Sequence, residues 1–235
     1  MFQPAWSITM NQTKQILLLV GSAKLKRSTS EVLGTYVLDR LSKTGFEPET
    51  RFAHKILKSD TGKVELMSSV NKADLIILAF PLFVDCLPYP VIRMLEHIAN
   101  NRQTDGNLKK QSFLCIVNCG FPEARQNNTA IAICRQFARE NGFNWAGGLA
   151  LGAGEVIAGR DLTKVGWLAR NVVKSLDLAI ESLADNMPIS RKAIDLMAKP
   201  LMPKWLYLIV GPSRWNRESK EHGVSEKILS RPYQQ

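Results

Sequence analysis

The most constraining feature of this sequence is a regular alternation between short apolar runs and amphipathic segments with helical spacing. The run "DLIILAF" (residues 74–80) has the length and continuous apolarity expected of a strand buried on both faces. Similar runs alternate with segments whose apolar residues recur at helical intervals. The expected strands are residues 16–20, 50–53, 74–80, 112–119 and 145–151, and the expected helices are 30–43, 63–71, one that begins at Pro90, 129–141 and 165–183. Five alternations predict an α/β fold with a doubly wound, five-stranded parallel sheet.

The charge of the chain divides it into two unequal parts. The net charge of the 235 residues is +10, and residues 188–235 carry an excess of five positive charges in one fifth of the length. The composition otherwise suits one α/β domain with a sizeable core. We therefore expect an α/β domain over residues 14–187 and a basic C-terminal extension over 188–235 that is helical in part.

Several classes of protein are disfavoured by what the sequence lacks. The four cysteines and three histidines have no metal-ligand spacing, so we expect no metal and no iron–sulfur cluster. The N-terminus has no apolar signal region, and no apolar run approaches the length of a membrane span. A reducing cytoplasm is the expected location.

The first expected strand is followed by a loop rich in hydroxyls and cations, residues 21–29. In doubly wound sheets, ligands bind beyond the carboxyl ends of the strands, where the strand order reverses. Ser22, Lys24, Ser28 and Thr29 crowd this turn at the start of a helix. Ser28 and Glu31 have capping-box spacing, so a well-capped helix is the plainer alternative to a phosphate site. We favour phosphate, because capping explains only Ser28.

The loops after the third and fourth expected strands indicate a slot for a planar ring. Pro81, Pro88 and Pro90 stiffen the segment "FPLFVDCLPYP" (80–90), in which Phe83 is apolar where a surface loop would be polar. A packed crossover into the next helix is an equally good interpretation of this loop alone. In "NCGFPEARQNN" (118–128), Gly120 would allow a ligand to approach the backbone closely, and Phe121 could cover a ring.

Together these loops resemble the flavodoxin-like NAD(P)H-dependent FMN reductase and quinone reductase family. The family's first loop has the form G-S-P-R-x-x-x-[NS]-[ST], which corresponds to Gly21–Thr29 here, with Ala23 in place of the usual proline and Arg27 where a small residue is common. Its second loop, P-[LVI]-[YF]-x-x-x-x-P, corresponds to Pro81–Pro88. The resemblance covers about residues 14–185. It implies a flavodoxin-like sheet with helices on both faces.

The resemblance also implies where FMN would bind. Ser22, Lys24, Ser28 and Thr29 would hold the phosphate. The isoalloxazine would lie between two segments, one formed by Pro81, Leu82, Phe83, Val84 and Asp85 and the other by Cys119, Gly120 and Phe121. NADH or NADPH would donate hydride, a quinone, flavin or nitro compound would accept the electrons, and no catalytic side chain is required because the flavin carries the chemistry. A flavodoxin-like electron carrier and a flavin-free interaction module are the alternatives.

The extension contains an apolar stretch, residues 205–210, flanked by cations and prolines. Packing on its own domain or contact with a second subunit in a homodimer or homotetramer are the favoured interpretations. Peripheral membrane contact ranks below them. Nucleic acid binding is not expected, since the cations form no recognition motif.

Overall fold

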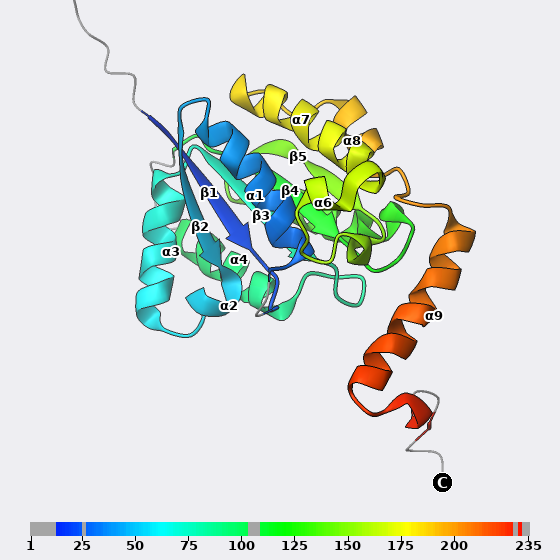
Figure 1. Ribbon diagram of the computed structural model, residues 1–235. Helices are drawn as coiled ribbons and strands as arrows, with labels where there is room; N and C mark the ends of the chain where they lie inside the picture. The colour runs from blue at the N-terminus through cyan, green and yellow to red at the C-terminus, as the bar shows by residue number, and fades with distance from the viewer. Residues whose placement is uncertain (1–12, 25–26, 103–108, 228–229, 232–235) are drawn as a thin grey trace, which may run out of the picture.

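A computed structural model describes residues 13–24, 27–102, 109–227, 230 and 231, and it contains one parallel sheet of five strands (Figure 1). The strand order is β2-β1-β3-β4-β5. The strands are β1 (Lys14–Val20), β2 (Phe46–Phe52), β3 (Leu75–Pro81), β4 (Ser112–Asn118) and β5 (Asn144–Leu151). This is the doubly wound order of the flavodoxin-like fold, so the predicted fold class is confirmed.

Helices cover both faces of the sheet and create two separate apolar cores. One core lies under α1 (Thr29–Ser42), α6 (Leu162–Val165), α7 (Arg170–Ala184) and α8 (Arg191–Met197). The other lies under α2 (Ala53–Ile56), α3 (Asp60–Lys72), α4 (Tyr89–Arg102) and α5 (Asn128–Glu140). The central strands β1, β3 and β4 contribute side chains alternately to both cores, which explains their continuous apolar sequences.

Two predicted elements differ most from those observed. β2 begins at Phe46 and not at residue 50, because its sequence "FEPETRF" is that of a half-exposed edge strand whose polar residues hide the pattern. The long helix expected over residues 165–183 is interrupted at Gly166, which has a φ of +69°. A 3-10 turn (Gly166–Ala169) follows, and α7 then begins at Arg170.

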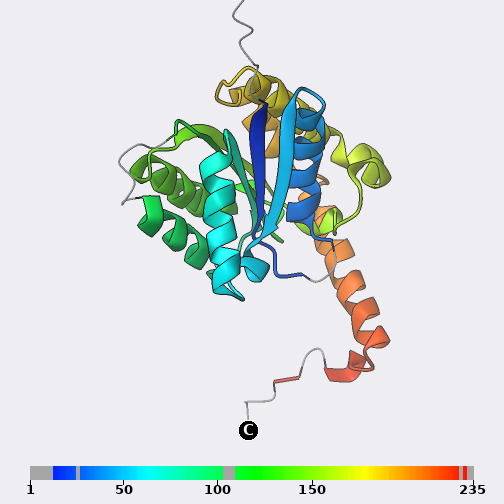
Figure 2. The same ribbon diagram turned by 90° about the vertical axis from the view of Figure 1, so that its left-hand side faces the viewer.

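The domain core continues past residue 187 into the expected extension. Ile189, Ala193, Met197 and Leu201 are buried in the same core as α1 and α7. Beyond them, α9 (Lys204–Glu221) extends away from the α/β body, and a final 3-10 turn (Ser225–Lys227) follows it (Figures 1 and 2). The division at residue 187 remains a prediction, but the part that leaves the body begins after Leu201.

The order of the strands in the sheet predicts where a ligand would bind. From β1 the chain crosses to β2 at one edge, and it then returns to β3 on the other side of β1. The strand order therefore reverses between β1 and β3. The loops at the carboxyl ends of these two strands diverge to opposite faces of the sheet and leave a crevice.

Candidate functional site

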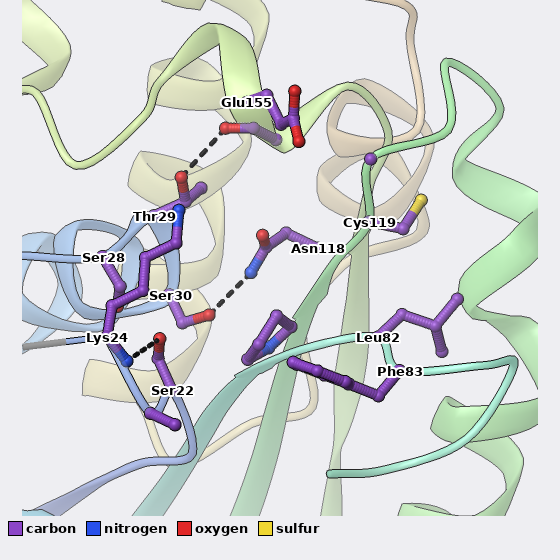
Figure 3. A pocket seen from close by; sticks show the side chains of 14 residues that line it. Ser22, Lys24, Ser28, Thr29, Ser30, Leu82, Phe83, Asn118, Cys119 and Glu155 are labelled. Atoms are coloured by element: carbon purple, nitrogen blue, oxygen red, sulfur yellow. Dashed lines mark hydrogen bonds between the residues drawn. The ribbon is translucent and has the colours of Figure 1, made fainter. Parts of the chain in front are cut away.

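A cavity of about 410 Å³ lies in this crevice, at the carboxyl ends of the strands (Figure 3). Its volume is within the range of cofactor sites. Four loops line it, one after each of β1, β3, β4 and β5. The lining residues are Ser22, Ala23, Lys24, Ser28, Thr29, Ser30, Pro81, Leu82, Phe83, Asn118, Cys119, Gly120, Gly154 and Glu155.

The first loop places four hydroxyls at one end of the cavity. Ser28 is the N-cap of α1, and its Oγ accepts a hydrogen bond from the Glu31 amide at 3.1 Å, while the Glu31 carboxylate accepts from the Ser28 amide. The capping box is therefore real, as the plainer interpretation required. However, among the described residues the hydroxyl protons of Ser22, Ser28 and Ser30 have no acceptor, so they remain available to a ligand.

Thr29 differs from the other three. Its hydroxyl donates to the Gly154 carbonyl at 2.9 Å, and it therefore ties the first loop to the loop after β5 (Figure 3). Thr29 lines the cavity, but in this structure its hydroxyl proton is engaged within the protein.

Backbone groups add to the polar end of the cavity. The amide N–H groups of Thr29 and Ser30 belong to the first turn of α1 and have no acceptor among the described residues. The N-terminus of a helix also carries a partial positive charge. The side chain of Lys24 lies along the same side of the cavity, beside Ser28 and Thr29 (Figure 3). Hydroxyls, free amides and an ammonium group at one place suit a phosphate.

Arg27, which departs from the family's pattern in the first loop, does not line the cavity. It is exposed, and its charge acts on Asp161, the N-cap of α6. Hydrogen bonds from the Thr163 hydroxyl and amide lower the pKa of Asp161, and the nearby charges of Arg27 and Lys164 add to this effect. Arg27 therefore interacts with the α6 region.

The loop after β3 gives the cavity an apolar side. Pro81, Leu82 and Phe83 line it, and Phe83 is 54% exposed. Val84 and Asp85 do not line the cavity in this structure. They form a tight turn in which both have positive φ, and Phe83 and Cys86 exchange backbone hydrogen bonds across it. Positive φ is unusual for a β-branched residue such as Val84.

The loop after β4 supplies Cys119 and Gly120 to the opposite side of the cavity. An added Cβ at Gly120 would meet only Glu155 Oε1, at 3.8 Å, and the backbone there has no positive φ. The protein's own packing therefore does not explain this glycine, whereas a ligand that approaches the backbone would. Phe121 is 54% exposed and does not line the cavity, although it adjoins Gly120.

Sequence reasoning missed the fourth loop, which follows β5. Asn118 Nδ2 donates to Ser30 Oγ at 2.7 Å, and a Cβ at Gly154 would lie 2.7 Å from Asn118 Oδ1. A Cβ at Gly159 would lie 1.9 Å from the Arg27 carbonyl oxygen. The fourth loop therefore packs closely against the first. It also contributes the carboxylate of Glu155 to the cavity lining. The signal was the glycine spacing of "GAGEVIAG" (152–159) directly after a strand.

The described residues of the cavity do not favour chemistry by a thiolate or a metal ion. Burial raises the pKa of Cys119, so its thiol is neutral near pH 7. Burial also raises the pKa of Cys115, which contacts Cys134 in the core. The described residues hold no group of three potential metal ligands. No helix within the described ranges has the length and apolarity to cross a membrane.

Comparison with known proteins gives matches only at the level of structure. No family model matches the chain, and no curated protein matches it in sequence. An FMN-dependent NADH-azoreductase from Bacillus anthracis in complex with FMN is 12% identical with a TM-score of 0.54, over 73% of this chain and 99% of that chain. RosB with a bound riboflavin-phosphate intermediate is 12% identical with a TM-score of 0.56, over 88% of both chains.

A putative quinone reductase from Klebsiella pneumoniae is also similar in structure. It is 13% identical with a TM-score of 0.54, over 75% of this chain and 87% of that chain. At such low identity these likenesses define a class of fold. The chain is a flavodoxin-like α/β protein, with the fold that azoreductases, quinone reductases and flavin reductases also have.

Proposed function

We propose that this protein is an FMN-binding oxidoreductase that uses NADH or NADPH to reduce a small acceptor such as a quinone, flavin or nitro compound. One observation carries the proposal. One cavity, at the β1/β3 switch point, has a polar end that suits a phosphate and an apolar side that suits a flat ring. Its wall also contains Gly120, which the packing of the protein does not explain. The solved azoreductase structure with FMN, which has a similar fold, supports the choice of ligand.

The residues present fit FMN. Ser22, Lys24 and Ser28, with the free amides of Thr29 and Ser30, would hold the dianionic phosphate. The stiff segment Pro81–Phe83 and the backbone at Cys119 and Gly120 would hold the flat ring and exclude water from it. When bound, FMN would accept hydride from the nicotinamide and pass electrons on, so the chain needs no acid–base pair. The protein's contribution is position and electrostatics.

We also propose a homodimer or homotetramer in the cytoplasm. The apolar side chains of Trp205 and Ile209 are 65% and 60% exposed on α9, at a spacing that puts them on one face of the helix. A second subunit would cover that face. Nucleic acid and membrane partners remain the disfavoured alternatives.

The test is a flavin titration followed by anaerobic reduction. The purified full chain should bind one FMN noncovalently, and FMN should bind more tightly than riboflavin, which lacks the phosphate. The bound flavin should be bleached rapidly by NADH or NADPH. A chain that cannot be loaded with FMN would refute the proposal. Binding without rapid reduction by either nicotinamide would instead identify an electron carrier.

A further inference from the structure

The segment Cys119–Phe121, at the wall of the cavity, has three consecutive carbonyl groups that all accept hydrogen bonds. The Cys119 carbonyl accepts from the Gly154 amide at 2.8 Å, and the Phe121 carbonyl accepts from the Ala153 amide at 2.6 Å. Both donors belong to the loop after β5. The carbonyl between them, that of Gly120, accepts instead from the hydroxyl of Tyr207 on α9. The C-terminal extension therefore reaches the wall of the candidate site.

The Tyr207 contact is anchored on the body of the domain. The ring of Tyr207 is partly buried against the core that lies under α1 and α7, although most of α9 extends away from the body (Figure 1). Its neighbours on the helix, Trp205 and Ile209, are exposed. Tyr207 is thus the residue through which the described part of α9 meets Gly120.

The amide groups of the same segment have no partners. Among the described residues, the N–H groups of Gly120 and Phe121 donate to no acceptor. A peptide unit is planar and trans, so the Gly120 carbonyl and the Phe121 N–H point in opposite directions. Gly120 lines the cavity and Tyr207 does not, so a Gly120 carbonyl that accepts from the Tyr207 hydroxyl leaves the opposite side of this peptide, with the Phe121 N–H, available to a ligand.

We infer that Tyr207 is a positioning residue, which fixes the peptide between Gly120 and Phe121 so that its N–H can donate to the polar edge of a planar ring in the cavity. The inference rests on the proposed flavin function. It couples the C-terminal extension to the ring end of the site and not to the phosphate end.

Tyr207→Phe tests this inference, because it removes one hydroxyl and keeps the ring that packs on the core. The affinities for FMN and for riboflavin should both fall, by roughly three- to tenfold, as expected for one hydrogen bond. Equal losses are expected because the affected contact is with the ring, which both ligands share. The absorption bands of the bound flavin should also shift, a change that a purely structural role would not produce. Trp205→Phe, on the same helix, is the control and should change neither.

Hydrogen exchange in the flavin-free chain separates this inference from the proposed function. Exchange of the Ala153 and Gly154 amides, which donate to the Phe121 and Cys119 carbonyls, should become faster in Tyr207→Phe, while the midpoint of thermal unfolding stays the same. Unchanged exchange of these two amides would overturn the inference, and so would unchanged flavin affinity and spectrum. If exchange responds as expected but the wild-type chain binds no flavin, the proposed function is wrong. In that case Tyr207 still positions the peptide, but the peptide N–H does not serve a flavin ring.

Discussion

At the scale of single residues, glycines in the cavity wall fall into two kinds. Gly154 is required by packing, because its missing Cβ makes room for Asn118. Gly120 is not required by packing, because the nearest atom to an added Cβ is 3.8 Å away. The two positions therefore separate the needs of the fold from the needs of a ligand.

We expect Gly120→Ala to leave the free energy of unfolding unchanged and to weaken FMN binding by about tenfold or more, since the added methyl group would meet the ligand. The matched variant Gly154→Ala should lower the free energy of unfolding by about 1–3 kcal/mol, because its Cβ collides with Asn118. Denaturant unfolding and flavin titration measure both effects. If Gly120→Ala bound FMN as tightly as the wild type, the ring would lie elsewhere in the cavity.

The hydroxyls of Ser28 and Thr29 stabilise the protein and also line the cavity, so their replacement needs a matched control. Changing both to Ala should weaken FMN binding far more than riboflavin binding if they serve the phosphate. Ser59 caps α3 in a similar way, with its side chain 3.1 Å from the Gly62 amide, outside the cavity. Ser59→Ala should cost about 1 kcal/mol of stability, as a lost cap does, without an effect on either ligand. Equal losses for FMN and riboflavin would show that only the helix had been weakened.

At the scale of elements, α1 and α7 are joined beside the sheet by a polar contact. The Tyr36 hydroxyl donates to the Asp177 carboxylate at 2.8 Å, and Arg40 lies 3.4 Å from the same carboxylate. Burial, the hydrogen bond to Asp177 and its charge raise the pKa of Tyr36 to about 12 from its usual value of 10. Since α1 begins at the polar end of the cavity, this contact also helps to hold that end in place.

Tyr36→Phe should therefore destabilise the protein by about 1 kcal/mol at neutral pH. The folded-state pKa is raised, so the unfolded chain loses the Tyr36 proton first as the pH rises. The stabilisation is fully present below about pH 10 and disappears as the pH rises from 10 to 12. Denaturant unfolding of the variant and the wild type at several pH values measures this difference. A difference that stayed constant up to pH 12 would show that the hydroxyl acts through packing alone.

At the scale of the whole molecule, the buried core of the domain extends to Leu201, and α9, which extends away from the body, begins at Lys204. Truncation at residue 187 would remove Ile189, Ala193, Met197 and Leu201 from a core that they help to fill. Truncation after Met202 would remove α9, including the partly buried Tyr207, but would keep those four buried residues. Only the second truncation separates the role of the extension from the stability of the domain.

A chain that ends at Met202 should still fold but become a monomer. Burial of Trp205 and Ile209 against a second subunit would contribute about 1.5–3 kcal/mol each, and this contribution would be lost. Light scattering measures the change, and Trp205→Glu in the full chain should reproduce it without truncation. An oligomer of unchanged size would exclude α9 as the subunit contact. Salt-sensitive binding of the full chain to anionic vesicles would instead favour the membrane interpretation.

The sequence by itself determined the sheet, the order of its elements and most of the cavity wall. Continuous apolar runs, capping residues and stiff prolines are local signals, and the loops they define come together because parallel strands end at one edge. Only the tertiary structure decided that Thr29 donates to Gly154, that Val84 and Asp85 turn away, and that Tyr207 reaches Gly120. Thr29 and Gly154 are 125 positions apart, and Tyr207 and Gly120 are 87 apart. Such contacts depend on the path of the chain, which local patterns do not encode.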